Sequence, residues 1–340
     1  MTMHLVMKEI EAGRASYDDY VTITEESWAL RQPRGSSLMF LEPGQKVTLR
    51  EIMLGLAVPS GNDAAVAAAL HLAPTVAEFT AMMVEEARRM GMKYTRFTEP
   101  AGISSRNRTT AADFALFSRQ YLELYPDSLA EFHSVRSFSY PLAANVSDAN
   151  RLNPRTITQN NSNTLLRTFP GVDGLKTGFI GASGHNIALT AERDNTRFIL
   201  ILLGATTASG GVLVRNDDSA RLLTWAFNNF KTIRPPQYEI EESVLLEAPL
   251  WLGRADKVEL KLTESVNFTS HVNRGDSLFY EVVINETLIA PLPAGFNAGY
   301  LCIKDEYGEL NRIPLVTAAS YERGNVFKRL WHSVVLLLRR

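Results

Sequence analysis

The spacing of apolar residues predicts that the first part of the chain folds into a layer of helices. Apolar positions recur at helical intervals over residues 1–12, and Thr48 with Glu51 three residues on has the pattern of a capping box. Residues 64–72 are alanine-rich and carry no polar stripe, so we expect a helix buried at the centre of the layer. Two further helices are expected, over residues 75–90 and 110–124.

A short loop lies between two of these predicted helices, and we expect both helices to be buried. Residues 59–63 interrupt the helical pattern with proline, serine, glycine and asparagine. A loop inside a core needs a reason, since its backbone polar groups must all find partners. A catalytic cleft is one such reason, which makes Ser60 and Asn62 candidate site residues.

Farther along the chain the pattern changes to that of a sheet. Residues 186–191 alternate and residues 198–203 are almost continuously apolar, which predicts two consecutive strands. Lys176, Thr177 and Gly178 come just before them, on a segment that would open an antiparallel meander. A strand edge with an ammonium, a hydroxyl and a glycine suits an extended substrate, because glycine lets the ligand approach closely. A turn with an exposed lysine is the plain alternative for so short a motif.

The pattern of the remaining residues predicts a helix that ends the first domain and a small β module after it. A helix over residues 217–230 is followed by Pro235 and Pro236, where we place a domain boundary. Residues 238–320 contain short alternating stretches separated by turn residues, which predicts a small all-β module.

Residues 321–340 have the pattern of an amphipathic helix, with Trp331 among the apolar residues on one face and Lys328 on the other. Spanning a bilayer takes roughly 20 apolar residues, far more than this segment offers in one run, so we expect the helix to lie in the membrane plane. Arg339 and Arg340 would add attraction to anionic lipid. A helix packed on its own domain is the alternative.

Composition narrows the possible functions. Lys plus Arg (35) nearly balance Asp plus Glu (37). The chain therefore has no net positive charge that would attract nucleic acid, and we expect no nucleic-acid role. Cys302 is the only cysteine, which excludes an internal disulfide and a cysteine metal cage. The six histidines lack the H-E-x-x-H spacing. We therefore expect neither a metal nor a cofactor.

Several motifs together resemble one family. Ser60-Gly61-Asn62 and Lys176-Thr177-Gly178 resemble the second and third motifs of the serine penicillin-binding proteins and class A β-lactamases. Residues 35–44, 90–92 and 222–227 resemble, in the family's order, the low-molecular-mass D-alanyl-D-alanine carboxypeptidases. The small β module also resembles that family's carboxy-terminal domain, so the resemblance covers essentially the whole chain.

The resemblance implies a fold class and a division into domains. The fold would be an α/β (α+β) penicillin-binding and β-lactamase-like domain with an antiparallel sheet and a helical layer. It would occupy residues 1–235, lacking its N-terminal part, and be followed by a β domain over 238–320. An amphipathic membrane-anchor helix would occupy residues 321–340.

The implied activity is that of a serine-type D-alanyl-D-alanine carboxypeptidase. Such an enzyme removes the terminal D-alanine from peptidoglycan pentapeptide through an acyl-enzyme and is sensitive to penicillin and other β-lactams. By this resemblance Ser60 relays a proton to the leaving amine, Asn62 holds the substrate amide, and Lys176 supplies positive charge. The expected location is the periplasm, on the outer face of the bacterial cytoplasmic membrane.

The same resemblance implies a substrate-binding set made of Lys176, Thr177, Gly178 and Arg215. Arg215 would bind the terminal carboxylate as a planar bidentate donor, although a surface arginine flanking a helix is the alternative. Phe179 stands where relatives often carry histidine.

The family's first motif is not found here, since no Ser-x-x-Lys occurs in the 340 residues. In the family it begins a helix and is followed almost immediately by residues similar to Met1-Thr2-Met3-His4. We therefore expect the acylated serine and its lysine base just upstream of Met1, preceded by two strands and an export signal. The alternative is a protein that begins at Met1 and acts as a non-catalytic peptidoglycan-binding or scaffold protein.

Overall fold

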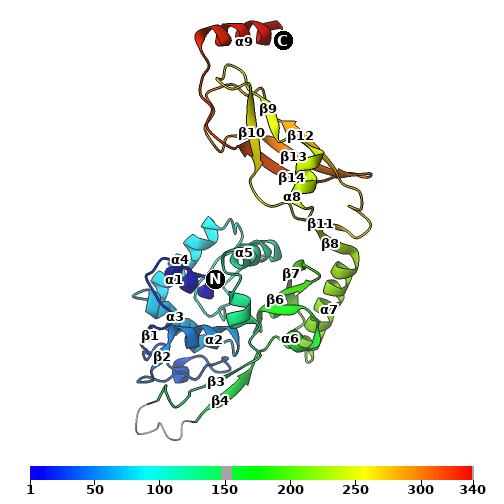
Figure 1. The fold of residues 1–340 in the computed structure, drawn as a ribbon. Helices are drawn as coiled ribbons and strands as arrows, with labels where there is room; N and C mark the ends of the chain where they lie inside the picture. Colours follow the sequence, from blue (N-terminus) through cyan, green and yellow to red (C-terminus); the bar gives the residue numbers. More distant parts are fainter. Residues whose placement is uncertain (147–154, 339–340) are drawn as a thin grey trace. The chain divides into compact units, whose positions relative to one another are not determined.

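The computed structural model describes residues 1–146 and 155–338 and divides the chain into two compact units, Met1–Trp225 and Ala226–Arg340. The first unit combines helices with an antiparallel sheet, and the second combines a β-sheet with a C-terminal helix (Figure 1). This arrangement confirms the expected fold class.

The helical layer of the first unit follows the predicted pattern closely. Thr48 and Glu51 form the expected capping box, and the Thr75 and Thr110 hydroxyls cap two later helices. Its helices, in chain order, are α1 (Thr2–Glu11), α2 (Leu49–Ala57), α3 (Asn62–Leu72), α4 (Val76–Arg89) and α5 (Ala111–Leu124). As predicted, the alanines of α3 lie in the core.

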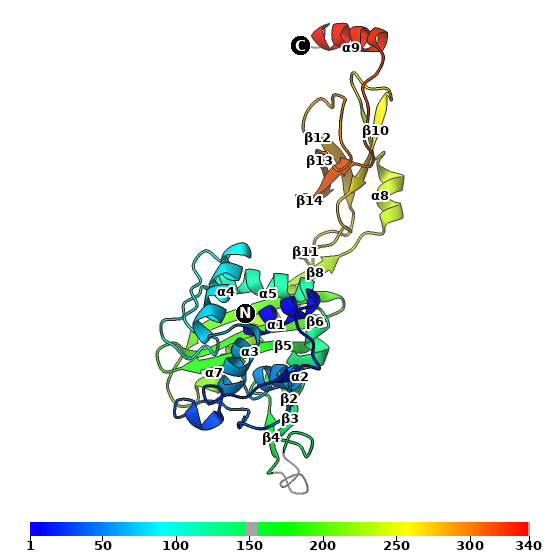
Figure 2. The same ribbon diagram turned by 90° about the vertical axis from the view of Figure 1, so that its left-hand side faces the viewer.

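The sheet of the first unit is the predicted antiparallel meander. Its three strands are β5 (Val172–Ile180), β6 (Gly184–Arg193) and β7 (Thr196–Ala205). Lys176 is paired with Ala188, and Ala188 is paired with Ile201, so the lysine lies in mid-strand. Figures 1 and 2 show α5 and α7 (Gly211–Asn229) on opposite faces of this sheet. The alternative of an exposed lysine in a turn is therefore wrong.

Shorter elements complete the first unit. They are β1 (Tyr20–Val21), η1 (Ala29–Arg31), β2 (Val47–Thr48), η2 (Leu129–His133, a π-helical turn), β3 (Ser137–Tyr140), β4 (Ile157–Asn160) and α6 (Leu165–Thr168). β1 pairs with β2, and β3 pairs with β4, both antiparallel.

Two predicted helix starts were too late. Asn62 is the first residue of α3 and not part of the preceding loop, because Gly61 takes the N-cap position and Asp63 provides the acidic first turn. α7 begins at Gly211, six residues before the expected Asp217, since Gly210 turns the chain at a φ of 85°. Arg215 consequently lies inside a helix.

The second unit contains a five-stranded antiparallel sheet in the order β12-β13-β14-β10-β9. Its elements are β8 (Phe230–Ile233), α8 (Gln237–Ser243), β9 (Glu247–Pro249), β10 (Lys257–Leu262), β11 (Phe268–His271), β12 (Phe279–Ile284), β13 (Asn297–Asp305), β14 (Gly308–Thr317) and α9 (Val326–Leu338). β8 pairs with β11 outside this sheet. Val258, Leu301 and Leu315 are fully buried in a core of its own.

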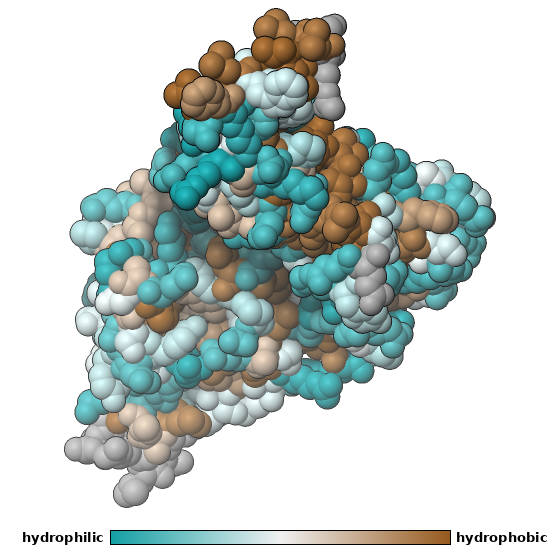
Figure 3. Space-filling view, turned by 45° about the horizontal axis from the view of Figure 1, so that its top comes forward, coloured by the Kyte–Doolittle hydropathy of each residue, from teal (hydrophilic) through white to brown (hydrophobic). Residues whose placement is uncertain are grey.

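α9 is an amphipathic helix without a buried residue, as the sequence predicted. Phe327, Trp331 and Leu338 are each at least two-thirds exposed, and Figure 3 shows apolar side chains gathered over this helix. Arg339 and Arg340 lie outside the described residues. Within the described ranges no single helix is long and apolar enough to cross a membrane, while α3 and α4, bent by 88°, pass that test only as a pair.

Candidate active site

The ammonium group of Lys176 lies in a partly desolvated position on β5. Its Nζ donates a hydrogen bond of 2.7 Å to the Thr177 carbonyl oxygen, and the side chain is half-buried. Burial, and after it the positive charge of Arg215, lowers the pKa of Lys176 to about 8. A lysine with such a pKa exchanges its proton near neutral pH and still carries positive charge there, which suits a catalytic cation.

The strand beyond Lys176 faces open space. A Cβ atom added at Gly178 would meet no atom within 4 Å, and both Gly178 and Phe179 are exposed. The Phe179 ring lies 4.3 Å from that of His185, centroid to centroid, on the neighbouring strand. This segment therefore leaves room for an extended ligand along β5.

Arg215 is buried on α7, with a side chain only 3% exposed, so the alternative of a surface arginine is wrong. Its Nε and Nη2 donate to the Asn216 Oδ1 at 3.1 and 2.8 Å, and it forms no ion pair with any carboxylate of the described residues. Burial lowers its pKa. A desolvated guanidinium without a carboxylate partner retains the ability to bind an anion.

Ser60 and Asn62 lie at the junction of α2 and α3. Ser60 has a φ of 63°, a left-handed conformation that is unfavourable for a residue with a side chain and is concentrated at functional sites. The Gly61 N–H donates to the Gly55 carbonyl at 2.8 Å, and the Asn62 N–H donates to the Ser37 carbonyl at 2.9 Å. The tight loop thus fixes the position of both candidate residues.

Asp63, which the sequence analysis did not single out, fastens a second loop to this junction. Its carboxylate accepts hydrogen bonds from the backbone N–H groups of Met39 (2.8 Å), Phe40 (2.8 Å) and Leu41 (3.0 Å). Burial raises the pKa of Asp63, while these N–H groups act in the opposite direction. The carboxylate keeps the chain around residues 37–41 beside Ser60.

His133 supports the strand that carries Lys176, and it too was missed. Its Nδ1 is 3.1 Å from the Leu175 carbonyl oxygen, and its Nε2 is 2.9 Å from the Tyr121 hydroxyl. Burial, with a smaller contribution from the Lys176 charge, lowers the pKa of His133 to about 4. The imidazole is therefore neutral at pH 7, donating from Nδ1 to the carbonyl and accepting the hydroxyl proton at Nε2.

The fold brings some of the candidate residues together. Lys176 lies close enough to Arg215 and His133 for their charges to interact. The Arg215 charge contributes to the lowered pKa of Lys176, and the Lys176 charge contributes to the lowered pKa of His133. Leu175 shares one buried cluster with Met39 and Ala64, which flank the Ser60 junction. No hydrogen bond joins the side chain of Ser60 or Asn62 to that of Lys176 among the described residues.

A metal centre has no structural support in the part of the chain that the structure describes. Those residues contain no group of three or more His, Cys, Asp or Glu side chains arranged to hold an ion. The chemistry available at this site is that of hydroxyl, amide, ammonium and guanidinium groups.

Comparison with known proteins agrees with this fold and these motifs. Residues 1–207 match the family described as D-alanyl-D-alanine carboxypeptidase. The chain is 30% identical over 338 residues to the D-alanyl-D-alanine carboxypeptidase DacD of Escherichia coli, covering 97% of this chain and 81% of that protein. It is 29% identical to DacC of the same organism, covering 99% and 80%.

Solved structures agree as well. Penicillin-binding protein 5 from Haemophilus influenzae superimposes with a TM-score of 0.81 at 26% identity, covering 95% of this chain and 88% of that one. Penicillin-binding protein D2 from Listeria monocytogenes in its cefotaxime-bound form matches with a TM-score of 0.54 at 26% identity, covering 66% and 83%.

The fold and the two motifs define a penicillin-binding protein. More particularly, the chain belongs to the D-alanyl-D-alanine carboxypeptidase family, whose members are serine-type enzymes. The family resemblance expected from the sequence is thereby confirmed.

Proposed function

We propose that this protein is the carboxypeptidase that removes the terminal D-alanine from peptidoglycan stem peptides, and that β-lactams inhibit it. One observation carries the proposal: Arg215 is buried without a carboxylate partner and lies within electrostatic reach of the partly desolvated Lys176. Two such cations beside an open strand edge suit a peptide that ends in a carboxylate. Membership of the family supports the same substrate.

In this proposal Thr177, Gly178 and Arg215 bind the substrate. The peptide lies along the exposed end of β5, where Gly178 leaves space and the Thr177 hydroxyl donates to the terminal carboxylate. Arg215 supplies the second charge for that carboxylate and Lys176 the first. Burial strengthens both interactions because fewer water molecules compete.

Ser60, Asn62 and Lys176 act on the reacting groups. The Ser60 hydroxyl passes a proton to the departing amine of D-alanine, and Asn62 holds the amide of the peptide. Lys176 stabilises negative charge that develops beside Ser60. The constrained backbone of Ser60 supports this role, since a strained residue at a loop between buried helices must be held by its surroundings.

The acylated serine and its lysine base come, in this proposal, from a Ser-x-x-Lys segment that precedes Met1, because none of the 340 residues forms that motif. The serine oxygen attacks the carbonyl between the two D-alanines, D-alanine leaves with a proton, and water hydrolyses the ester. Residues 1–235 then form the catalytic part, 238–320 the β domain and 321–340 the anchor. The enzyme works on the outer face of the cytoplasmic membrane.

Labelling with fluorescent penicillin tests the proposal on the protein expressed with its native upstream codons. We expect covalent labelling of the wild type and a loss of about 100-fold or more in the labelling rate for Lys176→Ala, comparable to removing a transition-state donor. Lys261→Ala, an exposed lysine of the second unit, is the matched control and should label normally.

Equal labelling of Lys176→Ala and wild type would refute the role of Lys176. The absence of Ser-x-x-Lys from these residues also leaves a second candidate, a non-catalytic peptidoglycan-binding or scaffold protein. That candidate is favoured if the upstream codons encode no Ser-x-x-Lys and the wild type binds peptidoglycan without being labelled.

A further inference from the structure

The connection between α4 and α5 concentrates positive charge in an otherwise balanced chain. Residues 88–108 contain six Lys or Arg residues and one Glu, whereas the whole chain has a net charge of −2. Arg88 and Arg89 pair with glutamates on α4. The other four are exposed and form no ion pair with the described residues: Lys93, Arg96, Arg106 and Arg108.

Two of these cations are set directly opposite each other. The Arg96 N–H donates to the Arg108 carbonyl at 2.8 Å, and the Arg108 N–H donates to the Arg96 carbonyl at 2.9 Å. In such an antiparallel pair the Cα atoms are roughly 5.5 Å apart and both side chains leave the same face. Like charges placed directly opposite destabilise a strand pair, so this arrangement costs stability unless an anion lies between them.

The neighbouring residues fix which face the arginines occupy. One position along the pair, the hydroxyls of Thr95 and Thr109 are 2.8 Å apart, and Thr95 also donates to Asp113 on α5 at 2.8 Å. Because successive residues of a strand point to opposite faces, the threonine face is turned toward α5. The face carrying Arg96 and Arg108 is consequently turned to solvent.

Two carboxylates of this region, those of Glu99 and Asp113, accept hydrogen bonds from other groups. Glu99 accepts hydrogen bonds from the backbone N–H groups of Ala101, Gly102 and Ser104 and from the Asn107 side chain. Asp113 accepts from the Tyr94 N–H at 2.7 Å in addition to Thr95. Both acids therefore stabilise the loop itself and leave its cations unneutralised.

We propose that Arg96 and Arg108 form a clamp for a phosphate group, with Lys93 and Arg106 adding charge around it. Two arginine side chains that leave the same face of a strand pair can offer several N–H donors to the oxygens of one tetrahedral anion, a geometry in which arginine is superior to lysine. A phosphate with two negative charges also neutralises the pair more fully than a carboxylate does. The phosphate belongs to a lipid headgroup or to a soluble polyphosphate.

Titration calorimetry with inorganic tripolyphosphate at low ionic strength tests the clamp on the full chain. We expect Arg96→Gln combined with Arg108→Gln to weaken binding at least tenfold. The matched control removes two exposed charges elsewhere, with Arg34→Gln and Lys261→Gln, and should change binding less than twofold. Arg96→Lys combined with Arg108→Lys keeps the charge and should still weaken binding several-fold, because the bidentate geometry is lost.

A second measurement identifies the source of the phosphate. It compares binding of the protein to vesicles that contain phosphatidylglycerol with its binding to neutral vesicles. A selective loss of vesicle binding in the Gln pair assigns the clamp to lipid headgroups, and loss of tripolyphosphate binding alone assigns it to soluble phosphate. The proposal is overturned if wild type binds neither probe, if the control pair loses as much as the clamp pair, or if the Lys pair equals wild type. Thermal melting should show that the Gln pair is at least as stable as wild type, which excludes loss of binding by unfolding.

Discussion

At the residue scale, His133 shows how burial converts an ordinary histidine into a neutral support for the strand that carries Lys176. Both ring nitrogens have partners, and one of these is the carbonyl of the residue preceding Lys176. Burial keeps the imidazole neutral until about pH 4, whereas an exposed histidine takes up a proton near pH 6.5. The unfolded chain therefore binds a proton at mildly acidic pH that the folded chain does not.

This difference predicts a pH dependence of stability. The contribution of His133 to stability is fully present above pH 6.5 and is lost as the pH falls toward 4. The total loss is about 3 kcal/mol. Urea unfolding at pH 7, 5.5 and 4.5 measures it. His133→Gln, which cannot titrate, should be less stable at pH 7 and should lose less stability on acidification than the wild type. Parallel curves for His133→Gln and wild type would contradict the assignment.

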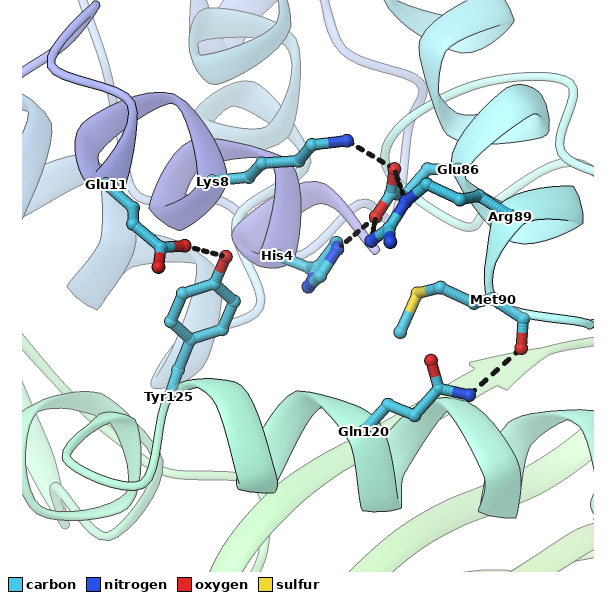
Figure 4. A network of polar contacts seen from close by, with 8 residues as sticks. All are labelled: His4, Lys8, Glu11, Glu86, Arg89, Met90, Gln120 and Tyr125. Atoms are coloured by element: carbon cyan, nitrogen blue, oxygen red, sulfur yellow. Dashed lines mark hydrogen bonds and ion pairs between the residues drawn. The ribbon is translucent and has the colours of Figure 1, made fainter. Parts of the chain in front are cut away.

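At the scale of elements, α1 is fastened to α4 by one buried carboxylate. Glu86 accepts hydrogen bonds from His4 (2.7 Å), Lys8 (2.5 Å) and Arg89 (2.5 Å), as Figure 4 shows. Although burial raises the pKa of Glu86, the hydrogen bonds from Arg89, Lys8 and His4 outweigh it and hold that pKa far below its usual range. The carboxylate stays ionised and links the two helices.

Removing this carboxylate should be costly. Glu86→Ala leaves His4, whose side chain is fully buried, without its partner, and breaking a buried pair costs about 3 to 5 kcal/mol. Glu85→Ala removes an exposed glutamate one residue away, which pairs with the exposed Arg88, and should cost less than about 1 kcal/mol. Urea denaturation of the two variants compares them directly. If both lose the same stability, the network does not fasten α1.

At the scale of the whole molecule, α9 gives the protein an apolar surface at its C-terminal end. The polar face of the helix contacts its own unit: His332 Nδ1 accepts a hydrogen bond of 2.9 Å from the Leu252 N–H, and the Lys328 Nζ lies 2.7 Å from the Asp256 carboxylate. The opposite face, with Phe327 and Trp331, is exposed. These contacts with its own domain use the polar face and leave the apolar face exposed, which the proposed membrane anchor requires.

Flotation with anionic liposomes tests the proposal that α9 is a membrane anchor. We expect the full-length protein to float and a variant ending at Ser320 to stay with the unbound fraction. Leu330→Glu, on the exposed apolar face, should reduce flotation strongly, whereas Ser333→Glu adds the same charge off that face and should reduce it less. Equal behaviour of full-length and shortened proteins would show that α9 is not the anchor.

The local sequence pattern alone was enough to predict most of the helices and strands and to recognise both motifs. The capping box at Thr48, the alanine-rich α3 and the alternation of β6 and β7 are visible in the sequence because each depends on neighbours only a few residues away. Lys176 and Arg215 could be named as candidates for the same reason, one from a motif and one from its place in a family pattern. Neither the depth of Arg215 nor the lowered pKa of Lys176 was predictable, since both depend on what packs around them.

The tertiary structure alone decided which polar groups support the site. The partner of His133 lies 42 residues away along the chain, and the His4 and Glu86 pair spans 82 residues. Arg96 and Arg108 were merely two basic residues until the fold placed them opposite each other. Periodicity records which face of an element is apolar, but a buried polar group is stabilised by a particular distant partner, and only the folded chain determines which partner that is.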